Sequence, residues 1–233
     1  MAVIGLLVLG WCTTQYFGKR AAVEIRSKQI SHAKILIRMM LDNMDESEHL
    51  VSTMAVSPWM APALEQQGSQ SLQLANKVLD SYSKALPGSV CYLLDLHGLT
   101  IASSNRSQAD SFVGKNFKLQ PYFKEAVSGE AGRYWSLGVV SKELGYYASF
   151  PVRGRDRQII GVAVLKRSVA DLASLFPSQS LGTVLDFNGV VVMCNRPQMV
   201  LKSMWPLPSE TRNRLMASHQ FGGGPFEPIL NQL

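Results

Sequence analysis

One hairpin pattern occurs twice in this chain, and it constrains the fold more than any other feature. The stretch LLDLHGLTIASSNR occupies residues 93–106, and VLDFNGVVVMCNR occupies residues 184–196. In each copy an apolar run ends at an aspartate, and a following glycine is free to take a positive φ at the turn. Asp186 follows Asp95 by 91 residues. Two copies at this separation indicate a duplicated module rather than a solenoid.

The sequence after the first hairpin predicts an antiparallel sheet. A short helix is expected over QPYFKEAVSG, ending at Gly129, and strands follow in GRYWSLGVVS, GYYASFPVR and QIIGVAVLKRSV. These strands are rich in β-branched and aromatic residues, and KELG and GRDR turns separate them. Together with the hairpin they make a five-stranded antiparallel sheet of the PAS type. An amphipathic helix from Ser69 to Ala85 precedes it, with Ser69 as its N-cap.

The second hairpin opens a smaller sheet. ADLASLF predicts a connecting helix before it, and SETRNRLMASHQF predicts a helix after it, with Ser209 as N-cap and Gly222 as stop. The expected fold class is therefore α+β, with one long N-terminal helix followed by two antiparallel-sheet modules near 75–168 and 178–233.

The long helix is predicted from Lys19 to about Leu64. No Gly or Pro interrupts it between Lys19 and Val56, and Pro58 and Pro62 then break or kink it. Some 35 helical residues span roughly 50 Å, more than a small domain. A plain core helix is disfavoured by this length, so we expect a stalk that pairs with a copy of itself as a homodimer. The stripe that would pair is Ile25, Ile30, Ala33, Ile37, Met40, Leu41 and Met44.

The first 20 residues, MAVIGLLVLGWCTTQYFGKR, carry no charge before Lys19. About 20 apolar residues cross a bilayer as a helix, and this run is slightly short and contains three polar residues at 13–15. A membrane anchor cut short at its N-terminus, a signal peptide and a buried helix remain possible, although no basic stretch or cleavage site favours a signal peptide. Trp11 and Tyr16 lie where an interface belt would place them, which favours the truncated anchor in a membrane.

Composition excludes several classes of function. Apolar residues make up 46% and charged residues 17%, which is typical of globular proteins. The net charge of +6 is scattered, and its densest group, 153–157, carries its own aspartate, so no nucleic acid is expected. Nucleophile-elbow, phosphate-loop and zinc-protease motifs do not occur, so we expect no catalytic residues, no cofactor and no metal. Cys91 and Cys194 fall in strands of different copies and are expected to be free and buried.

Two longer stretches carry a family resemblance. TIASSNRSQADSFVGKNFKLQPYFKEAVSGEAGRYWSLGVVSKELGYYASFPVRG resembles the membrane-distal half of double Cache (PAS-like) sensor domains, and LKSMWPLPSETRNRLMASHQF is similar to the membrane-proximal half. The family type is the periplasmic domain of DctB-type sensor histidine kinases for four-carbon dicarboxylates. The resemblance runs from about Lys19 to the end, and it is most specific in SFVGKNF, PYF and GYY. It implies a two-component receptor in the bacterial inner membrane, with its sensor domain in the periplasm and a small carboxylic acid as ligand.

The resemblance also implies a division of the chain. Residues 1–18 are expected to be a partial transmembrane anchor, 19–65 the stalk helix, 66–168 the membrane-distal ligand-binding module and 169–233 the membrane-proximal module. No kinase part precedes Leu233, so we expect a piece of a receptor or an isolated sensor. The alternatives are the ligand-binding half of a chemotaxis receptor or cyclic-nucleotide enzyme, or a structural module with a degenerate pocket.

The resemblance implies seven ligand-binding positions in the membrane-distal module. They are Phe117, Gln120, Val140, Ser141, Lys142, Tyr147 and Lys166. Phe117, Gln120 and Val140 stand where the family has Tyr, Arg and Thr, while the other four match. A bidentate Arg supplies a charge and a matching fork, which a neutral Gln does not. A monoanion, a longer or less polar acid, or no ligand at all is compatible with these changes.

Strand alternation gives separate support for Lys166. Val162, Val164 and Lys166 share one face of GVAVLKRSV, so the lysine points to the covered side if the valines do. The alternative is an exposed lysine on an edge strand. Tyr146 and Tyr147 must point to opposite faces, so only one of them can line a pocket.

Overall fold

The structure, a computed structural model, describes residues 2–66, 68–178, 180–218, 220–224 and 226–230. Its contacts divide the chain into two compact units, Met1–Asn43 and Met44–Leu233. The first unit is the N-terminal part of helix α1 (Ala2–Ala55). Apart from Tyr16, the side chains of residues 1–18 lie outside the described part of the structure, as does that of Ile25. Within the described residues, no helix is long and apolar enough to cross a membrane.

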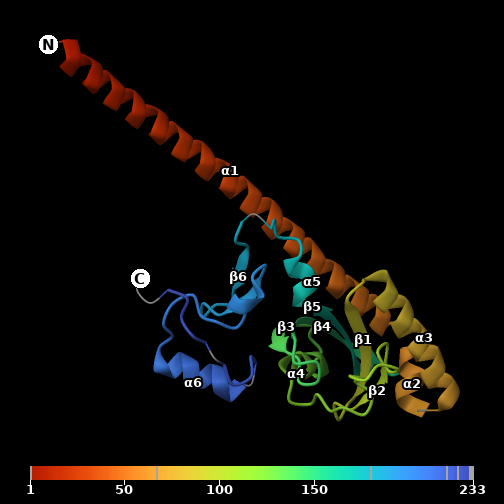
Figure 1. Ribbon diagram of the computed structural model, residues 1–233. Coiled ribbons are helices and arrows are strands. Elements are labelled where there is room, and N and C mark those ends of the chain that lie inside the picture. Colours follow the sequence, from red (N-terminus) through yellow and green to blue (C-terminus); the bar gives the residue numbers. More distant parts are fainter. Residues whose placement is uncertain (1, 67, 179, 219, 225, 231–233) are drawn as a thin grey trace. The chain divides into compact units, whose positions relative to one another are not determined.

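The second unit contains the expected five-stranded antiparallel sheet (Figure 1), in the order β2-β1-β5-β4-β3. Its strands are β1 (Ser89–Asp95), β2 (Thr100–Ser103), β3 (Gly132–Leu137), β4 (Leu144–Arg153) and β5 (Ile159–Ser168). Strand β5 lies between β1 and β4, and the register places Lys166 between Val90 and Tyr147. The lysine therefore lies on an inner strand, not on an edge.

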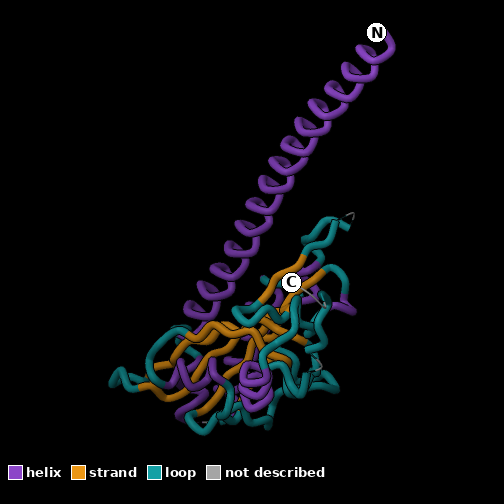
Figure 2. Tube along the Cα trace, turned by 90° about the vertical axis from the view of Figure 1, so that its left-hand side faces the viewer, coloured by secondary structure: helices purple, strands orange, loops and turns teal. Residues whose placement is uncertain are grey.

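The two faces of this sheet are covered by different helices. Helix α4 (Pro121–Val127) covers one face, where aromatic and β-branched side chains of β1, β4 and β5 form a buried cluster. The last turns of α1, with α2 (Met60–Gln66) and α3 (Ser69–Ala85), pack on the sheet as well, and Met54 and Met60 are fully buried. Figure 2 shows the strands of this sheet side by side. Full burial of one such side chain contributes about 1.5–3 kcal/mol.

Two predicted helix starts were wrong by one residue. Ser69 is the first residue of α3, and the cap position is Gly68, with φ −73° and ψ 152° and no side-chain cap. Helix α6 (Ser209–Ser218) begins at Ser209, where Arg212 N donates to the Pro208 carbonyl at 3.0 Å. Serine favours the cap position, but before α3 it is Gly68 that holds the extended backbone that a cap needs. Helix α6 also ends before Gly222, and His219 of the predicted stretch lies outside the described residues.

The long helix also differs from its prediction. It begins at Ala2 and ends at Ala55, and α2 is a separate short helix. The break falls at Pro58 as expected, because proline disfavours helical geometry in the residue before it. Pro62 lies inside α2 near its start, where a missing N–H is tolerated.

The remaining elements follow the larger sheet along the chain, within the same compact unit, and are called the second module. They are α5 (Val169–Ala173), β6 (Thr183–Leu185), β7 (Val191–Cys194), the 3-10 helix η1 (Pro197–Met199) and α6. Strands β6 and β7 form a two-stranded sheet of their own, so the two hairpins belong to separate sheets, as expected. Cys91 and Cys194 are free and buried, and burial raises the pKa of the Cys91 thiol to about 12.

Both hairpins close with the same hydrogen bonds. The aspartate Oδ1 accepts from the backbone N–H groups two and four residues later, at 2.8 and 2.9 Å for Asp95 and at 2.9 and 2.7 Å for Asp186. Gly98 and Gly189 take φ of +79° and +86° at the turn. This geometry needs a carboxylate followed by a glycine, which explains why the two sequences match there.

Candidate functional site

Strand β5 points Lys166 toward the face that α4 covers, in line with Val162 and Val164 as alternation predicted. The lysine is only 6% exposed. Its Nζ donates to Ser141 Oγ at 2.6 Å and lies 5.8 Å from the centroid of the Phe112 ring. Within the described residues, no carboxylate forms an ion pair with it. A buried cation held by one hydroxyl and one ring keeps capacity to bind an anion.

The groups around Lys166 set its charge. Burial lowers the pKa of its ammonium, while the exposed carboxylates Glu143 and Asp110 oppose that shift. Burial, and then Glu143, raises the pKa of Tyr147 above its ordinary value, so its hydroxyl stays protonated and can donate. The site therefore offers one cation and hydroxyl donors, which is the chemistry that recognises a carboxylate.

A tight loop between β3 and β4, residues 138–143, carries Ser141 to the lysine. Lys142 N donates to the Gly138 carbonyl at 2.9 Å, and Lys142 takes φ of +56°. A Cβ at Gly138 would meet Ser141 Oγ and would lie 3.1 Å from the Tyr147 hydroxyl. Only glycine leaves room for the serine and the tyrosine to approach each other here.

Aromatic rings form the wall beside this loop. Tyr147 stacks on Tyr122 with ring centroids 4.8 Å apart and an interplanar angle of 3°, and Tyr92 OH donates to Tyr122 OH at 3.0 Å. Phe112 and Phe117 pack edge to face at 5.7 Å. Sequence reasoning missed Tyr92, Phe112 and Tyr122. Alternation in SVCYLLD, which places Tyr92 on the same face as Leu94, could have indicated the first of them.

The structure brings together five of the seven predicted residues. Ser141 bonds to Lys166, and the remaining three, Phe117, Val140 and Tyr147, belong to the aromatic cluster or pack against it. The other two predicted residues stand apart. Gln120 is half-buried directly before α4, and Lys142 is exposed. No contact within the described residues joins either side chain to the lysine.

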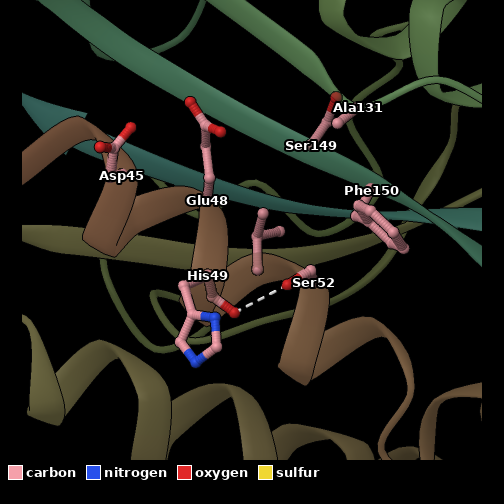
Figure 3. A pocket seen from close by; sticks show the side chains of 8 residues that line it. Asp45, Glu48, His49, Ser52, Ala131, Ser149 and Phe150 are labelled. Carbon is pink, nitrogen blue, oxygen red and sulfur yellow. Dashed lines mark hydrogen bonds between the residues drawn. The ribbon is translucent and has the colours of Figure 1, made fainter. Parts of the chain in front are cut away.

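The opposite face of the sheet carries a cavity of about 300 Å³ with a mixed polar and apolar lining, and none of the predicted residues lines it. Figure 3 shows Glu48 and His49 of α1 across from Ser149 and Phe150 of β4. The Glu48 carboxylate accepts from Tyr146 OH at 3.1 Å and pairs with an arginine guanidinium at 2.6 Å. The charge of Glu48 is thus already compensated. Tyr146 points to this face of the sheet, whereas Tyr147 points to the face that α4 covers.

Comparison with known proteins finds no family model that matches the chain. The chain is 33% identical over 209 residues to the C4-dicarboxylate transport sensor protein DctB of Pseudomonas aeruginosa, a match that covers 88% of this chain and 34% of that protein. A protein of the same name from Rhizobium meliloti is 29% identical over 160 residues, covering 68% and 26%. The crystal structure of the V. cholerae histidine kinase DctB sensor domain matches with a TM-score of 0.82 and 26% identity, covering 88% of this chain and 80% of that one.

The long helix and the antiparallel sheet, with the structural match, define a sensor domain of the PAS-like, double Cache class. Within that class the chain is a DctB-type sensor domain. It spans about a third of the length of the P. aeruginosa relative.

The burial of Lys166 predicts how the free energy of unfolding of the ligand-free domain depends on pH. Because burial lowers the folded-state pKa, the unfolded chain binds more protons, and stability should rise with pH as the buried ammonium loses its charge. Lys166→Met should therefore raise the free energy of unfolding at pH 7 by about 1 kcal/mol. This gain should shrink as the pH approaches the lysine's ordinary value of 10.5.

Thermal and urea unfolding across pH 6 to 10 would measure this effect. Lys124→Met is the matched control, because Lys124 is exposed on α4 and should show no gain. A Lys166→Met protein that is less stable than its parent at neutral pH would contradict the prediction.

Proposed function

We propose that this domain is the extracytoplasmic, periplasmic input domain of a sensor histidine kinase in the bacterial inner membrane, and that it binds a small carboxylic acid at Lys166. The observation that carries the proposal is the buried ammonium, whose hydrogen-bond partner among the described residues is a single hydroxyl at 2.6 Å. The name of the P. aeruginosa relative, a C4-dicarboxylate transport sensor protein, supports the same chemical class of ligand. That a full-length parent would have kinase activity is inferred from these relatives.

A carboxylate at Lys166 would gain from the low dielectric of the site. Charge-assisted hydrogen bonds contribute about 1.5–3 kcal/mol each, and Ser141 and Tyr147 offer hydroxyl donors beside the ammonium. The cluster beyond them is apolar, with Phe117 and Val140 at positions where a second carboxylate would need donors. The site thus favours an acid with one carboxylate on the lysine and a less polar remainder.

Calorimetric titration with a panel of mono- and dicarboxylic acids tests the proposed function. At least one acid should bind the parent domain, and Lys166→Met should abolish that binding, because the variant loses the only buried ammonium among the described residues. The Lys124→Met control should bind as the parent does. A domain that binds none of the acids, or a Lys166→Met variant with unchanged affinity, would argue for a structural module with a degenerate pocket.

The three substituted positions predict weak binding of four-carbon dicarboxylates. Loss of two to three contacts at about 1–2 kcal/mol each moves a micromolar affinity to the millimolar range. Succinate or malate should therefore bind weakly, and Gln120→Arg combined with Val140→Thr should strengthen binding. Micromolar affinity for succinate in the parent, or no gain in the double variant, would refute this prediction.

We also propose that the domain forms a parallel homodimer through α1. Apolar residues at 30, 33, 37, 40 and 44 alternate in steps of three and four, which is the spacing of a coiled-coil seam. Ile30 and Ile37 are 48% and 57% exposed in the single chain, so a second copy would bury apolar surface that water now contacts.

Analytical ultracentrifugation tests this assembly. The double variant Ile30→Glu, Ile37→Glu should shift the protein to a monomer, because it places like charges in the seam of a parallel pair. Ile35→Glu is a matched control, since Ile35 is 57% exposed like Ile37 but lies off the stripe. A parent that sediments as a monomer at high concentration would count against the proposal. So would a control, Ile35→Glu, that dissociates the dimer as much as the double variant does.

A further inference from the structure

Strand β3 is the edge strand of the larger sheet, and a residue of the second module occupies its outer side. Leu137 N donates to the Gln220 carbonyl at 2.8 Å, and Ser136 Oγ donates to the same oxygen at 3.1 Å. In return Gln220 Nε2 donates to the Trp135 carbonyl at 2.9 Å. The side-chain amide thus supplies the donor that the N–H of a paired strand would supply to an edge.

Gln220 is itself held firmly by the second module. Its backbone N donates to Ser218 Oγ at 3.2 Å, at the end of α6. The next residue, Phe221, is fully buried and packs edge to face against Phe226, with ring centroids 6.4 Å apart. The three hydrogen bonds to β3 therefore start from the packed core of the second module.

The two ends of the 138–143 loop are joined to each other, because Gly138 N donates to the Glu143 carbonyl at 2.8 Å and Leu137 pairs with Leu144 in the sheet. Its first residue, Gly138, directly follows Leu137, so the tie to Gln220 lies at the root of the loop that carries Ser141. At its other end, Glu143 and Leu144 line a cavity of about 250 Å³, with α5 and the β7 end of the second module as the opposite wall. Because the ends are joined, a shift of Leu137 moves the whole loop, so the tie to Gln220 acts on the position of Ser141.

We infer that Gln220 is a positioning residue for the ligand site of the first module. By fixing the β3 end of the loop it sets the distance between Ser141 and Lys166, and so the geometry offered to a carboxylate. The inference rests on the proposed role of Lys166 in binding the acid. By linkage, an acid that draws Ser141 inward changes the contacts of Gln220, and a movement of the second module changes the affinity for the acid.

Gln220→Met tests this role, because methionine keeps the unbranched shape of glutamine and removes the donor to the Trp135 carbonyl. The first readout needs no ligand. It is the rate at which acetic anhydride acylates Lys166, mapped by peptide mass spectrometry with the exposed Lys124 as internal reference. Loss of the constraint on Ser141 should raise the Lys166 rate by about 3- to 10-fold relative to Lys124, the factor expected for one hydrogen bond.

The second readout is the Kd for whichever acid binds the parent, which should rise by a similar factor. Gln220→Lys restores a donor of comparable reach and should return both readouts toward the parent values. Gln198→Leu is the control for a change on the same module, because Gln198 is exposed on η1 and should alter neither readout.

The outcomes separate this inference from the proposed function. If no acid binds the parent, the proposed function fails, and the acylation rates still decide the role of Gln220. An unchanged Lys166 rate in Gln220→Met overturns the inference, and so does a rise that Lys124 shares, because that means general loosening. If Gln220→Met does not fold, Ser136→Ala removes a different bond of the same tie. It should raise the Lys166 rate in the same direction, and no rise there overturns the inference as well.

Discussion

Burial of the Lys166 ammonium under a sheet is the constraint that shapes the site around it. An ionised group in an apolar core costs several kcal/mol unless something compensates its charge. Here the compensation is partial, from Ser141, the Phe112 ring and two exposed carboxylates. Groups kept in such a state are concentrated at functional sites, because the stability that they cost is recovered when a ligand binds. Gly138 and the left-handed Lys142 shape the loop that brings Ser141 to this charge, and Tyr147 stacks on Tyr122.

The larger sheet also connects its two faces through neighbouring residues. Tyr147 stacks on Tyr122 beside the cationic site, while Tyr146 donates to Glu48 on the last turns of α1. Because successive side chains of a strand alternate, a displacement of β4 that adjusts one tyrosine must displace the other. The strand therefore links the face that carries Lys166 to the helix face directly, and β3 links it to the second module through Gln220.

Local sequence signals predicted the strands well, because apolar alternation and turn residues act over a few positions. The faces of Lys166 and Tyr147 followed from the same rule. The cap at Gly68 was missed because propensity favours Ser69, whereas the backbone conformation of the preceding residue decides. The pair of Tyr92 with Tyr122 and the tie of Gln220 to β3 join residues 30 and about 84 positions apart. No local pattern encodes such contacts, because they depend on how the modules pack.

The burial of Cys91 and Cys194 has a consequence for a protein proposed to function in an oxidising compartment. Disulfide exchange requires a thiolate, and with a pKa of about 12 roughly one in 100,000 Cys91 side chains is ionised at pH 7. In the native state this thiol reacts slowly with the oxidants around it, and Cys194 is also free and buried. Cys91 becomes reactive only when the larger sheet opens. A lasting oxidation of Cys91 would therefore mark a molecule that had opened there.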